Sequence, residues 1–323
     1  MPDSLDRRRF LTLAAVAGAG TAVGARSQVP AAKTISTTFR VTLLGTGGPE
    51  LSAEGREGAA TLVQAGDQYL LFDAGRGVLK RLYQSGAPIN SVETVFLTHL
   101  HSDHIVGLPD LWITPWFLFA RKGPLQVYGP VGTQEMLEGM GHFLASDVRQ
   151  RPGKFNAAAD LAFKAHEFTE GAVVYQQGGI TVTSVPVDHK EGNPAFGYVV
   201  EFAGRKLVLS GDCTLSPALI AAGKGADVLI HNVFAPSPAL LARDANKRQV
   251  AEKLASPEQA AEVFVGTGAR QGVYSHVILL DSTEADVVRR TRAAGFKGPL
   301  VVGNDLMTIN IGELISISEQ LPR

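Results

Sequence analysis

A histidine-rich motif directly after an apolar run is the feature that most constrains this chain. Residues 94–97 (Thr-Val-Phe-Leu) are typical of a buried strand, and His-Leu-His-Ser-Asp-His follows almost at once. His99 and His101 are two positions apart, so in extended backbone their side chains leave on the same side. Asp103 and His104 come where the strand must end and the chain must turn. Four such ligands within six positions predict a site for zinc, manganese or iron, the alternative being a histidine-rich surface turn.

Three further ligand-type residues follow apolar, strand-like runs in the second half of the chain. They are His189, Asp212 and His276. Open α/β sheets build their sites at the carboxyl ends of strands, so we expect these residues to join the motif. His231 also ends an apolar run, whereas His142 and His166 do not, and we expect these two to be ordinary surface residues.

Shorter segments around these residues occur in a characteristic order. They are Leu-Gly-Thr-Gly at 44–47, Phe-Asp-Ala-Gly at 72–75, Tyr-Gly-Pro at 128–130, Leu-Ser-Gly-Asp at 209–212 and Tyr-Ser-His at 274–276. With the His-x-His-x-Asp-His motif, this order resembles the metallo-β-lactamase superfamily, and within it the ribonuclease Z and arylsulfatase-like branch. The resemblance runs from about Phe39 to Ile317. It implies an α/β fold, namely an αββα sandwich of two mixed sheets flanked by helices, with a two-metal site at one edge.

The resemblance also implies a role for each candidate residue. One metal would be held by His99, His101 and His189, the other by Asp103, His104 and His276, and Asp212 would bridge them. Two divalent cations are implied, zinc first, with manganese or iron as alternatives. A hydroxide between the two cations would attack the substrate, and Asp103 would orient this hydroxide. Asp73 would contact the ligands and orient them without binding metal itself, the alternative being an Asp that caps a turn. His231 is also expected next to the ligands and not among them.

The chain departs from the ribonuclease Z pattern at three places. The interval from Tyr198 to Asp212 is too short for the long insertion with which those enzymes grip transfer RNA. Asn232 stands where the family typically has Glu, and Leu254 where it typically has His. The resemblance implies that this missing pair protonates the leaving group. These departures argue against transfer-RNA processing and favour a smaller substrate.

Asp212 bears on the reaction, because relatives that cleave β-lactams typically carry cysteine or serine at that position. The favoured hypothesis is an exported two-metal hydrolase of a small phosphodiester or sulfate ester. One alternative is a hydrolase of a lactone, a β-lactam or a thioester. The other, motivated by Asn232 and Leu254, is a metal-binding protein with little turnover.

The first 25 residues indicate export. Arg7 and Arg8 lie in an Asp-Arg-Arg-Arg-Phe-Leu segment that looks like a twin-arginine signal, and the uncharged run after it is too short for a comfortable membrane span. We expect residues 1–25 to be a signal peptide, 26–38 a linker and 39–323 one hydrolase domain in the periplasm or outside the cell. An uncleaved amphipathic N-terminus is the alternative.

Composition limits the partners. A formal net charge of −1 over 323 residues, without a basic run, argues against nucleic acid as the main partner. We expect a small-molecule ester as substrate and no stable membrane anchor, and a homodimer stays open. The single cysteine, Cys213, excludes an internal disulfide, and we expect it to be buried rather than to act as a thiolate ligand.

Several elements can be placed from local patterns. Residues 133–143, 256–264 and 284–293 predict helices, the second from its Ser-Pro-Glu start. The bulky residues of 109–120 predict a core helix or the base of a lid, with a substrate-facing aromatic wall as the alternative. Residues 236–255 look polar and loop-like at their start.

Overall fold

The computed structural model describes residues 36–51, 55–151 and 157–319. The predicted signal peptide and all but the last three residues of the predicted linker therefore lie outside the described residues. Within the described ranges, no helix combines the length and the apolar character needed to cross a membrane.

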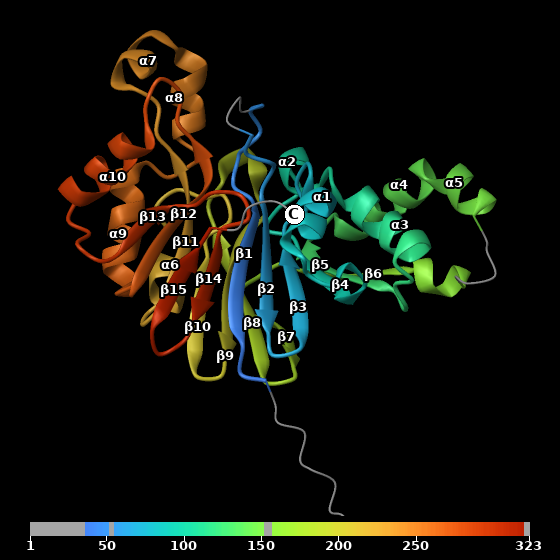
Figure 1. The fold of residues 1–323 in the computed structure, drawn as a ribbon. Coiled ribbons are helices and arrows are strands. Elements are labelled where there is room, and N and C mark those ends of the chain that lie inside the picture. The colour runs from blue at the N-terminus through green and yellow to red at the C-terminus, as the bar shows by residue number, and fades with distance from the viewer. Residues whose placement is uncertain (1–35, 52–54, 152–156, 320–323) are drawn as a thin grey trace, which may run out of the picture. The chain divides into compact units, whose positions relative to one another are not determined.

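Two β-sheets form the centre of the fold (Figure 1). The first has the order β15-β14-β1-β2-β3-β4-β5-β6 and the second β13-β12-β11-β10-β9-β8-β7. The first sheet contains β1 (Phe39–Gly45), β2 (Ala60–Ala65), β3 (Gln68–Phe72), β4 (Val92–Phe96), β5 (Leu125–Pro130), β6 (Phe163–Phe168), β14 (Thr308–Ile311) and β15 (Ile315–Ser318). The second contains β7 (Val173–Gln177), β8 (Ile180–Val187), β9 (Ala195–Phe202), β10 (Arg205–Leu209), β11 (Val228–Phe234), β12 (Gln271–Ile278) and β13 (Leu300–Val302).

Most of the helices lie along the outer faces of the two sheets, whereas the helical pair at residues 238–251 lies beyond the strand ends, at the top of Figure 1. They are α1 (Val78–Ser85), α2 (Ser102–Ile105), α3 (Leu108–Leu118), α4 (Thr133–Phe143), α5 (Ala145–Gln150), α6 (Pro217–Ala222), α7 (Pro238–Arg243), α8 (Ala245–Ala251), α9 (Pro257–Thr267) and α10 (Glu284–Ala293). Short 3₁₀ turns occupy Ile89–Ser91, Ala158–Leu161 and Lys190–Gly192. The predicted helices at 133–143, 256–264 and 284–293 are confirmed as α4, α9 and α10.

Alternation along the strands builds three apolar layers. In β10, Leu207 and Leu209 point between the sheets, whereas Val208 points outward against the layer that contains Phe264 of α9. On the other side, α1, α3 and α4 pack on the first sheet, and Trp112 of α3 is only 4% exposed. The predicted αββα sandwich is therefore confirmed. Helix α3 is a core helix, and the alternative of a substrate-facing aromatic wall is wrong for its buried tryptophans.

Two local predictions are wrong. Residues 236–255 contain the helices α7 and α8, because Ser237 and Asp244 cap their first turns with side-chain hydrogen bonds that a count of polar residues does not show. His166 is half-buried rather than an ordinary surface residue. Strand register places it opposite Tyr128, on whose ring it stacks at 4.2 Å between centroids. His142 is exposed, as predicted.

Parallel strand ends position the candidate site. Strands β3, β4 and β5 run parallel in the first sheet, and β10, β11 and β12 run parallel in the second. The motif and Asp73 follow β4 and β3, Asp212 follows β10, and His276 lies near the end of β12. The carboxyl ends of both parallel blocks therefore carry the predicted ligands except His189, which follows the antiparallel strand β8.

Candidate metal centre

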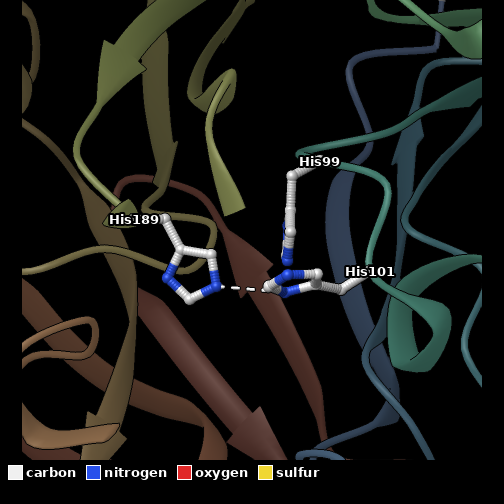
Figure 2. Close-up of side chains that lie close together, drawn as sticks. All are labelled: His99, His101 and His189. Atoms are coloured by element: carbon white, nitrogen blue, oxygen red, sulfur yellow. Dashed lines mark hydrogen bonds between the residues drawn. The ribbon is translucent and has the colours of Figure 1, made fainter. Parts of the chain in front are cut away.

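Three histidines from two loops meet at one side of the site. His99 and His101 lie in the loop between β4 and α2, and His189 follows β8 (Figure 2). The Nε2 atom of His189 lies 3.2 Å from Nδ1 of His101. The ring of His99 is centred 4.6 Å from that of His101 and 4.8 Å from that of His189. The three imidazoles thus face a common small volume, as the three ligands of one cation would.

A second triad lies beside the first and combines two histidines with a carboxylate. Oδ2 of Asp103 lies 3.2 Å from Nε2 of His276 and 3.5 Å from Nε2 of His104. The rings of these two histidines stack with their centroids 5.1 Å apart. Residues 173 positions apart in the sequence are therefore brought into one ligand set.

Asp212 joins the two triads through a single oxygen. Its Oδ2 lies 3.2 Å from Nε2 of His276 and 3.8 Å from Nε2 of His189. It also lies 3.5 Å from Nε2 of His104. One carboxylate oxygen within reach of both triads has the placement that a bridge between two cations requires.

The donor set fits divalent metal ions. The potential ligand atoms of each of three groups lie within 4.8 Å of one another; the groups are His99, His101 and His189; His99, His104 and Asp212; and Asp103, His104 and His276. The Nε2 atoms of His99 and His104 are buried without a hydrogen-bond partner among the described residues, which is costly unless another group meets them. Imidazole nitrogens with carboxylate oxygens are the donors that zinc takes in proteins. All seven predicted ligands thus lie together, and their individual roles stay predictions.

Neighbouring groups hold the far nitrogens of these histidines. Nδ1 of His104 lies 2.8 Å from Oδ2 of Asp73, and Nδ1 of His189 lies 2.9 Å from the carbonyl oxygen of Lys253. The Thr98 hydroxyl lies 3.0 Å from Nδ1 of His99 and also contacts Asp73. Such contacts select the tautomer that leaves the other nitrogen free for a metal. Asp73 therefore lies where the resemblance placed it. The sequence reasoning missed Thr98, which stands next to the motif, and Lys253, which acts through its backbone.

At both sides of the site, the backbone of a glycine lies close to the ring of a predicted ligand. A side chain at Gly192 would collide with the ring of His189, and one at Gly48 would come within 3.0 Å of Cε1 of His276. His276 itself has a φ of 49°, and the pairing of β11 with β12 shifts register beside it. A bulge at this point re-aims the His276 side chain away from the regular alternation of β12.

The electrostatic environment favours an ionised Asp212 carboxylate, and it shifts the neighbouring histidines in different directions. Burial alone would raise the pKa of Asp212, but His276 and His104 hold it well below its usual value. Burial, together with the neighbouring His104, lowers the pKa of His99 well below its usual value. Burial alone would lower the pKa of His104, but Asp73 and Asp212 raise it well above its usual value. Neutral imidazole and ionised carboxylate are the forms that bind metals. Cys213 is buried next to Asp212, and burial raises the pKa of its thiol, which argues against a thiolate ligand.

Asn232, His231 and Leu254 occupy the interior rather than the open side. Asn232 is 3% exposed, and its backbone N–H donates a hydrogen bond to Oγ of Ser210 at 3.0 Å. Its side chain lines a small cavity together with Asp212 and His231. Burial lowers the pKa of His231 to about 4, so this imidazole is neutral near pH 7. Leu254 packs in an apolar cluster with Phe234 and Ile278. Where the resemblance implies an acid pair, this chain places a buried amide and a core leucine.

Replacing Asp73 by asparagine should weaken metal binding by about 10–100-fold, because His104 then loses the carboxylate that fixes its tautomer. Metal titration of the purified protein, followed by calorimetry, measures this change. Asp67→Asn is the matched control, since Asp67 is an exposed residue of the turn between β2 and β3. Equal affinity in the two variants would contradict the orienting role of Asp73.

Comparison with known proteins relates this arrangement to a family. Residues 68–277 match the Beta-lactamase superfamily domain. The chain is 37% identical over 280 residues to a protein named ribonuclease Z from Mycobacterium sp. (strain KMS), which covers 84% of this chain and 96% of the relative. It is 34% identical over 277 residues to the ribonuclease Z of Mycobacterium marinum, covering 84% of this chain and 99% of the relative.

Solved structures show the same fold. The crystal structure of the short form of human tRNase Z matches with a TM-score of 0.65 and 22% identity over 84% of this chain and 99% of that one. A metallo-β-lactamase fold protein from Bacillus subtilis matches with a TM-score of 0.66 and 18% identity, over 85% of this chain and 100% of that one. At these identities the likeness concerns the fold alone.

Proposed function

Because this chain belongs to the metallo-β-lactamase superfamily, among the relatives of ribonuclease Z, and is a metal-dependent hydrolase, we propose that it holds two cations and cleaves a small phosphodiester or sulfate ester. Zinc is the proposed metal, with manganese or iron as alternatives. The arylsulfatase side of the predicted resemblance stays a prediction.

The position of Asp212 carries this proposal. Its Oδ2 lies within 3.8 Å of histidine nitrogens from both triads, so one residue can hold two cations together. When bound, two such cations lower the pKa of water to about 7 and polarise the oxygens of an ester. Asp103 lies at the rim of the second triad with Oδ2 toward His276, from where its carboxylate can orient an attacking water.

The charges around the site support a small ester over a polyanion. Two lysines near it are each close to a carboxylate: Lys190, which follows His189, to Asp188 at 2.5 Å, and Lys253, whose carbonyl oxygen contacts His189, to Glu191 at 2.8 Å. Binding of a nucleic-acid backbone relies on cations that neutralise several phosphates. Paired lysines supply little of this attraction. In addition, only Ala203 and Gly204 separate β9 from β10, so no RNA-gripping insertion is present between Tyr198 and Asp212.

Cleavage of an RNA phosphodiester is the second candidate, favoured by the name of the relatives and by their 96–99% coverage. The two candidates share the metal chemistry and differ in what binds outside the metals. They are therefore separated by substrate size rather than by the bond cleaved.

A panel of substrates tests the proposal. The purified protein, loaded with zinc or manganese, should contain two metal ions by elemental analysis and should hydrolyse nitrophenyl phosphodiesters or aryl sulfates. Lactones and nitrocefin represent the alternative bonds, and a transfer-RNA precursor represents the second candidate. One metal ion or none would contradict the two-metal arrangement. Faster turnover of the RNA than of every small ester would contradict the proposed substrate class.

We further propose export through the twin-arginine route, on the strength of the Arg-Arg pair near the N-terminus. Replacing Arg7 and Arg8 by lysine should leave the precursor in the cytoplasm, because a receptor reads this pair rather than its positive charge alone. Immunoblots of cytoplasmic and periplasmic fractions measure the effect, with Arg26→Lys as the control for loss of an arginine. Normal accumulation of the double variant in the periplasm would contradict this route.

A further inference from the structure

A pocket of about 280 Å³ lies directly beside the first triad, and His101 forms part of its wall. Three segments line it: Leu100 and His101 from the motif loop, Pro130 and Val131 at the end of β5, and the 191–194 segment after His189. Because His101 belongs both to this pocket and to the triad, a substrate held at the triad can extend a substituent into it. The pocket therefore adjoins the candidate metal centre and shares His101 with it.

The walls of this pocket combine an aliphatic part with a polar part to which His101, Glu191 and Asn193 belong. Leu100, Pro130 and Pro194 contribute apolar surface, and Val131 is 53% exposed although it is a large hydrophobic residue. Within the described part of the chain, the ionisable residues of the lining are His101 and Glu191, and the Glu191 carboxylate lies 2.8 Å from Nζ of Lys253. Among the residues that the structure describes, no Phe, Tyr or Trp lines the pocket, so these residues offer no aromatic platform on which nucleobases could stack.

The 188–194 segment that closes the pocket is held by hydrogen bonds. The side-chain oxygen of Asn193 accepts from the backbone N–H of His189 at 2.9 Å, and its amide donates to Asp188 at 3.1 Å. A side chain at Gly192 would collide with His189, so the segment can lie close to the triad only with glycine there. The wall is therefore formed before any ligand binds, and a ligand has little to order.

We propose that this pocket is a specificity site that receives an uncharged apolar substituent of the substrate, either an alkyl chain or a single aryl ring, with Val131 as its main determinant. A cavity of about 150 Å³ is enough for benzene, so this volume holds one substituted ring. The inference rests on the proposed function for the reaction itself. It adds the chemical class of the ester, namely one with an apolar group beside the bond cleaved.

Alkylphosphonates test the pocket without turnover, because they carry one metal-binding head and one apolar chain. Calorimetry on the metal-loaded wild-type protein should show affinity that rises from methyl- to hexylphosphonate, by up to roughly four-fold for each methylene buried. The rise should stop when the chain fills the pocket. Affinity that does not depend on chain length, or no binding at all, would overturn the proposal.

Val131→Asp places a charge in the wall at an exposed position, where the fold can tolerate it. The ratio of hexyl- to methylphosphonate affinity should fall by about ten-fold or more, since the chain loses its apolar contact. Using the ratio cancels the repulsion between the new carboxylate and the phosphonate head. The matched control is Val265→Asp, because Val265 on α9 is 54% exposed and lies outside this pocket. An unchanged ratio in Val131→Asp would overturn the proposal.

The outcomes separate this site from the proposed function. If alkylphosphonates bind as expected but neither phosphodiesters nor sulfates are hydrolysed, the pocket stands and the proposed reaction fails. If those esters are hydrolysed while the hexyl-to-methyl ratio is near one in the wild type, the reaction stands and the pocket fails.

Discussion

Replacing Asp212 by alanine should remove both metal ions and lower kcat/KM on the order of 10³-fold or more. Its Oδ2 is the oxygen that lies near both triads, so its loss separates them and leaves cations without a bridge. Metal ions supply several kcal/mol of transition-state stabilisation in such sites, which corresponds to a loss of this order. Elemental analysis gives the metal content, and hydrolysis of a nitrophenyl phosphodiester gives the rate.

Two companion variants sharpen this result. His276→Ala should chiefly empty the second position, since His276 contacts Asp103 and Asp212 and belongs to one triad. Cys213→Ala is the control for a change at the adjacent buried position, and it should retain both metals because the thiol is not a ligand. Full metal content and activity in Asp212→Ala would refute the bridging assignment. Loss of metal in Cys213→Ala would reopen the thiolate alternative.

The wild-type enzyme should discriminate strongly against poor leaving groups, by about 10²–10⁴-fold beyond the difference in intrinsic reactivity. A nitrophenolate departs without a proton, whereas an alkoxide needs one in the transition state. The positions that the resemblance assigns to the acid hold Asn232, whose amide cannot supply one, and Leu254, which is packed against Phe234 and Ile278. Comparing kcat/KM for nitrophenyl and alkyl phosphodiesters measures this preference.

Restoring an acid pair tests the same point in the opposite direction. Asn232→Glu with Leu254→His should improve alkyl esters selectively, provided that thermal unfolding shows the apolar cluster around position 254 still folded. Asn232→Gln with Leu254→Met is the matched control, since it changes side-chain size at both positions without adding an acid. Equal gains for both ester classes would show that the effect is not proton donation. Efficient cleavage of alkyl esters by the wild type would place the acid elsewhere.

The ligand set could be predicted from the sequence because it is mostly local. Four of the seven residues stand within six positions, and the other three follow short apolar runs at strand ends. Parallel strands end at the same edge of a sheet, so residues at those ends converge whatever the loops between them do. The sandwich itself was implied by the resemblance to the metallo-β-lactamase superfamily, and the apolar layers on both faces of strands such as β10 agree with it.

Other features depend on contacts between distant segments and have no local signal. The Lys253 carbonyl that holds His189 is an ordinary backbone group, and only the docking of the α8 end brings it there. Leu254 could be noticed as a departure, but its place beside Ile278 comes from packing.

Register and loop closure decided the rest. His166 looked like a surface residue until the pairing of β6 with β5 placed it on Tyr128. Val131 and Pro194 are 63 positions apart in the sequence, and closure of the segment after His189 makes them walls of one pocket. The sequence by itself thus determined which residues can hold metal, because that depends on side-chain chemistry and strand periodicity. The tertiary structure alone decided which groups orient these ligands and which pocket lies beside them. Both depend on how segments that are distant in the sequence pack against one another.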